Sequence, residues 1–149
     1  MARPKDYRDL IVWQKAMALA RSAYAETLGL PKSEAYGLLV QIRRAAVSIP
    51  SNIAEGHGRL TDLQFRHFLG NARGSVYELR TQFELAADPG YLEQKSVRQL
   101  MEPGAEVTRL LNGLIASLCT RGAVRSLSGS SSSASPANSA SSARKGLHG

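Results

Sequence analysis

The sequence lacks the residues on which several classes of small protein depend. Its 149 residues include one cysteine, Cys119, which excludes an intramolecular disulfide framework and a multi-cysteine zinc site. No run of about 18 apolar residues occurs, so an ordinary transmembrane helix is excluded. The first ten residues carry five charged side chains and no apolar signal-peptide core. We therefore expect a cytoplasmic protein with no membrane partner.

Residue patterns typical of catalytic and metal sites are also missing. A di-iron helical bundle needs Glu-x-x-His pairs on two helices, and the sequence contains none. His57 and His67 are expected at the surface, and Cys119, at the end of an apolar segment, in or near the core. Ser48 and Ser75 have no patterned base beside them. We predict no catalytic residue, no metal, no cofactor and no enzymatic activity.

The residues that are present divide the chain into two parts. Residues 1–121 hold all 12 acidic residues and 16 of the 19 basic ones, and the chain has a formal net charge of +7. Residues 122–149 are mostly Ser, Ala and Gly, with too little apolar side chain to offset the entropy cost of ordering the backbone. We predict a folded domain over 1–121 and a flexible tail over 122–149.

Apolar residues recur every three or four positions over residues 8–28, 32–55, 61–87 and 93–118, which predicts four helices. In the first segment the predicted core stripe is Leu10, Trp13, Met17, Ala20, Tyr24 and Leu28. Pro50 is expected to kink the second helix, and Pro103-Gly104 to interrupt the fourth. Because short connections make consecutive helices antiparallel neighbours, the expected fold is all-α, an up-down-up-down antiparallel four-helix bundle.

One segment carries a recognisable signature. Residues 41–59 read QIRRAAVSIPSNIAEGHGR, and DLIVWQK, PKSEAYGL, FRHFL and ARGSVYEL occur around them in the expected order. Over roughly residues 6–120 the sequence resembles the bacterial four-helix-bundle proteins named for intervening sequences in large-subunit rRNA genes. The resemblance implies a homopentamer without an established enzymatic activity. Relatives include the accessory proteins of diversity-generating retroelements, so it also implies a reverse transcriptase as a partner to test.

The signature also has a physical interpretation. Ser48, Asn52 and Glu55 share one helix face, and we expect them to hold the end of the second helix and to cap the third. Gly56 and Gly58 are expected to supply positive φ angles in the turn between these helices. A phosphate site at this two-glycine turn is the weaker alternative, because no P-loop lysine follows it. The spacing of Gly70 and Gly74 predicts a close approach between helices.

Arginine is the residue type most informative about function. Three arginines at seven-residue spacing form a row beside the core stripe of the third helix, and three more precede them: Arg66, Arg73 and Arg80, and Arg43, Arg44 and Arg59. One interpretation is solubility and ion pairing, for example between Arg80 and Glu84. The other is sequence-independent binding of RNA or DNA through the phosphates, for which these six are the candidate residues.

Two functions follow from these observations. The first is a homo-oligomer that binds nucleic acid through charge, and the second is a protein–protein scaffold or adaptor. Apolar surface beyond one stripe per helix predicts a subunit interface. Ile11, Val12 and Leu19 lie off the first stripe, and Phe68 together with Tyr77 broadens the third. We therefore expect the protein to be its own partner.

Overall fold

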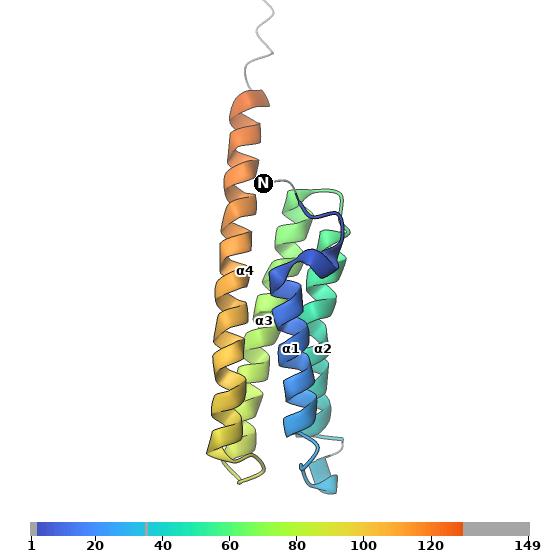
Figure 1. The fold of residues 1–149 in the computed structure, drawn as a ribbon, viewed down its shortest axis with the longest axis vertical. Coiled ribbons are helices and arrows are strands. Elements are labelled where there is room, and N and C mark those ends of the chain that lie inside the picture. Colours follow the sequence, from blue (N-terminus) through green and yellow to red (C-terminus); the bar gives the residue numbers. More distant parts are fainter. Residues whose placement is uncertain (1–2, 35, 130–149) are drawn as a thin grey trace, which may run out of the picture.

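The structure is a computed structural model that describes residues 3–34 and 36–129. Within these ranges the chain forms four α-helices and two 3-10 turns, and no strand: η1 (Tyr7–Asp9), α1 (Ile11–Glu26), η2 (Lys32–Glu34), α2 (Leu38–His57), α3 (Asp62–Ala87) and α4 (Gln94–Gly129). The four helices run alongside one another (Figure 1). The all-α four-helix fold predicted from the sequence is confirmed.

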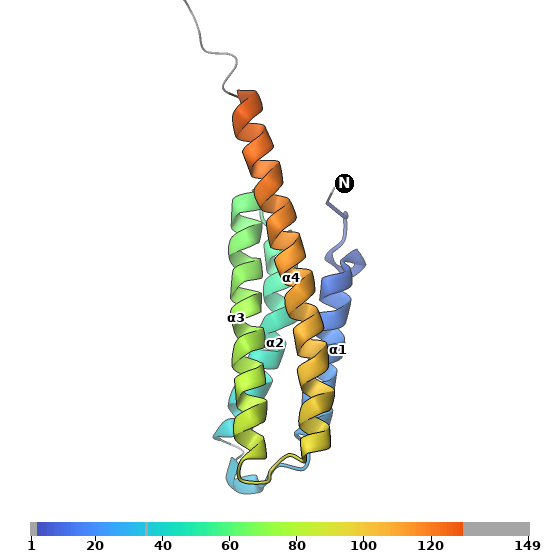
Figure 2. The same cartoon turned by 90° about the vertical axis from the view of Figure 1, so that its left-hand side faces the viewer.

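Each helix packs against two neighbours. α1 and α3 both pack against α2 and α4, whereas no Cα atoms of the described residues come within 8 Å of one another between α1 and α3 or between α2 and α4. Connections lie at alternating ends: α1–α2 and α3–α4 are joined at the lower end in Figure 1, and α2–α3 at the upper end. The helices therefore follow one another around the bundle in the order α1, α2, α3, α4, with α1 diagonal to α3, and α4 extends beyond its neighbours (Figure 2).

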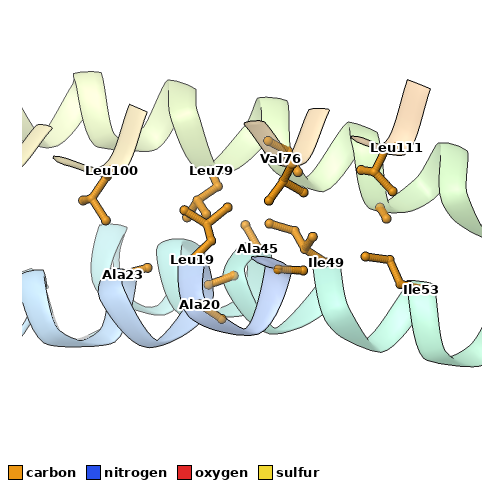
Figure 3. Close-up of a cluster of buried hydrophobic side chains, with 14 of the residues drawn as sticks. Leu19, Ala20, Ala23, Ala45, Ile49, Ile53, Val76, Leu79, Leu100 and Leu111 are labelled. Atoms are coloured by element: carbon orange, nitrogen blue, oxygen red, sulfur yellow. The ribbon is translucent and has the colours of Figure 1, made fainter. Parts of the chain in front are cut away.

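The core stripes predicted for α2, α3 and α4 are largely confirmed. Ile49 and Ile53 of α2, Val76 and Leu79 of α3, and Leu111 of α4 are fully buried and converge in the interior (Figure 3). Five other residues predicted for these three stripes are only half-buried: Leu38, Phe68, Met101, Leu114 and Ile115.

The stripe predicted for the first helix was only partly right, because Leu10 and Ala20 are buried but Leu28 is 78% exposed. The buried residues of this helix are Val12, Ala16, Leu19, Ala20 and Ala23, whereas Trp13 and Met17 are half-buried and Tyr24 is 40% exposed. The small side chains of Ala16 and Ala23 allow α1 to approach its neighbours closely, and the larger aromatic residues lie on its outer side. Val12 and Leu19, predicted to belong to a subunit interface, are core residues instead.

Neither internal proline ends its helix. α2 is continuous through Pro50, and α4 is one helix through Pro103, so the predicted interruption of the fourth helix was wrong. A proline removes one backbone hydrogen bond, and the buried packing of Val107 and Leu111 holds the following turns of α4 in place. α4 continues to Gly129, past the predicted domain boundary at Arg121, and residues 130–149 of the predicted tail lie outside the described residues.

Two glycines, one on α2 and one on α4, allow these helices to pack closely against side chains of α3. A Cβ on Gly56 would lie 2.6 Å from Phe68 Cβ, and one on Gly104 would lie 3.1 Å from Arg80 Cδ. Gly70 and Gly74, predicted to provide the close approach, have no neighbour within 4 Å of such a Cβ. The positive φ expected at Gly56 and Gly58 was also wrong, since Gly90 is the glycine with this conformation in the described part.

Candidate nucleic-acid interface

The arginine row of α3 lies along its border with α4. Arg66, Arg73 and Arg80 are half-buried. Arg73 Nη1 donates a hydrogen bond to Asn112 Oδ1 of α4 at 2.9 Å, and the Arg80 side chain packs over Gly104. The absence of a side chain at Gly104 makes room for the Arg80 methylene groups, which accounts for a glycine at this point of α4.

No residue of this row has an acidic partner in the described part of the chain. The predicted ion pair between Arg80 and Glu84 is not formed, because the two groups are not within 4.0 Å. The Nε atoms of Arg66 and Arg80 are buried, and neither has a hydrogen-bond acceptor among the described residues. A buried donor without an acceptor is destabilising by about 1–3 kcal/mol. Because these Nε atoms are shielded from the surface, an external anion would have to bind the terminal guanidinium nitrogens instead.

The other candidate arginines lie elsewhere. Arg59, in the α2–α3 connection, forms a 2.7 Å ion pair with Glu55 and stacks its guanidinium over the Phe68 ring at 4.6 Å. Arg43 reaches from α2 towards α1 and lies over the Tyr24 ring at 4.7 Å, and Arg44 is exposed on the same helix. The structure therefore does not bring the six arginines together: Arg66, Arg73 and Arg80 form one row, and the others belong to different surfaces.

The signature residues connect α2 to α3. The hydroxyl oxygens of Ser48 and Ser75 are 2.8 Å apart, and Asn52 Nδ2 donates to the Ser48 carbonyl at 2.8 Å and to Ser48 Oγ at 2.9 Å. Capping of the third helix by Asn52 and Glu55 was a wrong prediction. Thr61 caps α3, because its hydroxyl accepts a hydrogen bond from the Gln64 amide at 3.2 Å, as the Thr61–Gln64 spacing indicates.

The N-terminal segment contributes contacts that sequence reasoning missed. Arg3 forms a 2.6 Å ion pair with Asp62, donates to the Arg59 carbonyl at 3.1 Å and lies over the Phe65 ring at 4.6 Å. The His57 ring Nε2 lies 2.6 Å from the Pro4 carbonyl oxygen, so His57 is half-buried rather than at the surface. These contacts hold the N-terminal segment against the α2–α3 connection. Sequence reasoning missed them because the paired residues are more than 50 positions apart, and no local pattern reveals such a pair.

The segment then enters α1 through η1. Asp6 Oδ1 accepts a hydrogen bond from the Arg8 amide at 2.8 Å, and this bond, with the nearby Arg8 charge, lowers the pKa of the Asp6 carboxyl. The lowered pKa extends ionisation of the carboxyl to lower pH, and an ionised carboxylate is a stronger acceptor for the cap hydrogen bond than the neutral acid.

An open groove runs between α1 and α2. Its volume is about 640 Å³, and three aromatic side chains, Tyr7, Trp13 and Tyr24, contribute to it together with Met17, Val47 and Pro50. Tyr7 and Trp13 meet edge to face, with ring centroids 5.2 Å apart. Trp13 and Tyr24 were predicted to lie in the core because of their helical spacing, but they line this groove instead.

Over residues 3–34 and 36–129 no three His, Cys, Asp or Glu side chains are grouped so as to hold a metal ion. Cys119 is exposed, so the prediction that it lies in or near the core was wrong. No helix in the described part has the length and apolar character needed to cross a membrane.

Comparisons with known proteins agree with the fold. A family model described as 23S rRNA-intervening sequence protein matches residues 8–113. Among solved structures, the chain is similar to a crystal structure of a protein with unknown function from the S23 ribosomal protein family of Bacteroides thetaiotaomicron. The TM-score is 0.65 at 22% sequence identity, over 70% of this chain and 98% of that one, so the likeness concerns the fold. No curated protein matches the chain.

Proposed function

The chain belongs to the 23S rRNA-intervening sequence protein family, and from this premise we propose that it is a non-enzymatic homo-oligomer that binds nucleic acid through charge. The supporting observation is the row of Arg66, Arg73 and Arg80 on α3, which has no acidic partner in the described residues. Two of its buried Nε donors also have no acceptor. Phosphate oxygens are acceptors of the right charge for the terminal guanidinium nitrogens of these arginines.

The physical basis of binding is charge neutralisation. Each phosphate that an arginine contacts releases condensed counterions, so binding is favourable for unrelated sequences and weakens steeply with salt. The formal charge of +7 per chain provides the long-range attraction. No motif that would read base edges was found, so the proposal concerns the phosphate backbone.

Self-association would multiply this effect. The resemblance implies a pentamer, in which five copies would carry a formal charge of +35 and repeat the arginine row around a ring. Exposed apolar side chains support an interface between copies: Ile11 is 62% exposed, and Tyr77 is 48% exposed.

The test is the variant Arg66→Ala/Arg73→Ala/Arg80→Ala, assayed by fluorescence anisotropy with labelled RNA and DNA of unrelated sequences. The bundle should remain folded by circular dichroism, because these residues border the core rather than fill it. Affinity should fall about equally for all sequences. The slope of log affinity against log salt should become shallower by about 0.7–0.9 for each phosphate that the variant no longer neutralises.

Two controls separate the row from other charges. Replacing Arg125, Arg144 and Lys145 with alanine removes the same number of charges from the C-terminal segment, of which residues 144 and 145 lie outside the described residues. Exchanging Arg80 and Glu84 keeps the net charge constant. Unchanged binding by the triple variant, with the oligomer intact, would contradict the proposal, and dissociation into protomers would assign the arginines to the subunit interface.

A protein–protein adaptor is the second candidate, with a reverse transcriptase as the partner that the resemblance suggests. The observation favouring it is the aromatic groove between α1 and α2. Binding of a partner through apolar contacts would change little with salt, which distinguishes it from binding of nucleic acid.

A further inference from the structure

The rim of the α1–α2 groove is basic and has no acidic counterpart. Arg21 belongs to its lining, and Arg43 and Arg44 line the adjoining hollow, which shares Tyr24 and Val47 with it. Neither lining contains an Asp or Glu. None of the three arginines forms an ion pair with another described residue. We refer to this surface as the basic groove.

A surface of the opposite charge lies on α3. Tyr77, Thr81, Glu84, Leu85 and Asp88 are all exposed and fall within about 100° of one another around the helix, and we call them the acidic face. Tyr77 is 48% and Leu85 53% exposed, so this face has an apolar component as well as two carboxylates. Glu84 and Asp88 form no ion pair among the described residues.

These two surfaces lie on different sides of the bundle. The basic groove is on the side formed by α1 and α2, whereas the acidic face is on α3 (Figure 1). Tyr77, Thr81 and Glu84 of this face line a shallow hollow towards α4, and Arg80 and Met101 complete its lining, so one arginine borders the acidic face. One chain therefore cannot bring its own acidic face into its own groove, but a second copy can. A contact between two different surfaces of identical chains is head-to-tail, and it closes into a ring when the rotation between copies allows it.

We propose that the basic groove of one copy receives the acidic face of the next. Tyr77 and Leu85 would then cover apolar residues of the groove, while Glu84 and Asp88 would meet the arginines at its rim. The inference rests on the self-association in the proposed function and names the two surfaces that produce it. It also assigns Arg43 and Arg44 to the subunit contact. Arg66 and Arg73 are left to nucleic acid, whereas Arg80 lies at the border of the acidic face.

Charge complementarity favours a second copy over nucleic acid in the groove. A nucleic acid bound there would neutralise the arginines but leave the exposed apolar residues and free carboxylates of α3 uncovered. A second copy accounts for both surfaces at once. Opposed charges around an apolar centre are the usual composition of a specific interface.

The test uses charge reversal at exposed positions, which should leave the fold unchanged. The groove variant is Arg21→Glu/Arg44→Glu, the face variant is Glu84→Arg/Asp88→Arg, and the combined variant carries all four changes. Matched controls reverse exposed charges elsewhere on α4 or just before it, by Arg98→Glu/Arg109→Glu and by Glu93→Arg/Glu102→Arg. Each control has the same net charge as the variant with which it is compared.

Mass in solution is measured by sedimentation at about 10 μM, with circular dichroism as the check on folding. The groove and face variants should each shift towards the protomer mass of 16.1 kDa, with self-association weakened about tenfold or more. Both controls should retain the wild-type mass. The combined variant should recover it, because reversing both partners restores attraction.

Several results would overturn the inference. A wild-type oligomer that persists in the groove and face variants would do so, as would a combined variant that stays a protomer. Loss of RNA binding in the groove variant with the oligomer intact would make the groove a nucleic-acid site instead. A wild-type protein that is itself a protomer at this concentration would contradict the proposed self-association as well, so the two failures are distinguishable.

Discussion

Replacing Gly56 with alanine tests the packing of α2 on α3. A Cβ at this position would lie 2.6 Å from Phe68 Cβ, 2.9 Å from Phe65 Cδ2 and 3.3 Å from the Phe65 carbonyl oxygen. Carbon atoms pack best at about 3.5–4.0 Å, so the closest approach is too short by about 1 Å. Phe68 Cβ is attached to the backbone and cannot rotate away, so the two helices would have to move apart.

The magnitude combines two opposing effects. Overpacking in a well-packed interior is destabilising by about 1–3 kcal/mol, and contact between two backbone-attached carbons belongs at the upper end of that range. Alanine within a helix is favoured over glycine by about 1 kcal/mol. The net loss is therefore about 2 kcal/mol, which lowers the Tm of a chain of this length by about 4–8 °C.

The assay is thermal and urea denaturation followed by circular dichroism, at one fixed protein concentration because self-association changes apparent stability. Gly74→Ala is the matched control, since that glycine is exposed on α3 with nothing within 4 Å of a new Cβ. It should leave stability unchanged or raise it by up to about 1 kcal/mol. Finding Gly56→Ala at least as stable as the wild type would refute the close packing of α2 on α3 at this point.

Two further predictions concern the signature and the C-terminal end. Ser48→Ala should reduce stability by about 1 kcal/mol, because Ser75 and Asn52 are each deprived of a hydrogen-bond partner, whereas Ser51→Ala at a neighbouring exposed position should change it by less than about 0.5 kcal/mol. Equal stability of the two variants in urea would show that the Ser48–Ser75 hydrogen bond contributes nothing. Truncation after Arg121 should change the Tm by no more than a few degrees, because residues 122–129 of α4 are exposed. A large loss of helical signal beyond the removed residues would contradict this expectation.

Periodicity in the sequence was sufficient for the fold class because it repeats over many residues. All of the stripe predicted for α3 is buried except Phe68, and the Thr61–Gln64 pattern marks the start of that helix correctly. α1 shows the limit of the method. Trp13, Met17 and Tyr24 follow the same helical spacing as a core stripe, but the buried residues are small neighbours such as Ala16 and Ala23. Hydrophobicity alone favoured the larger side chains.

Proline and glycine were misjudged for a related reason. Pro103 lowers local helix propensity, yet α4 remains continuous because tertiary packing outweighs that local preference. Gly56 was predicted to need a positive φ, whereas the structure requires a residue without a side chain there because Phe68 lies close by. A glycine in the sequence shows that a position is constrained, but the neighbouring residue that causes the constraint is known only from the tertiary structure.

By itself the sequence determined the four helices, the lack of disulfide and multi-cysteine zinc chemistry, the positive charge and the spacing of the arginine row, because each depends on local order or on composition. The tertiary structure decided which arginines belong together. It separated Arg43 and Arg44, near α1, from Arg66, Arg73 and Arg80, along α4. It also paired Arg3 with Asp62. In addition, it placed the basic groove and the acidic face on different sides of the bundle. Such relations depend on how the helices are rotated and paired, and that is set by packing across the whole chain.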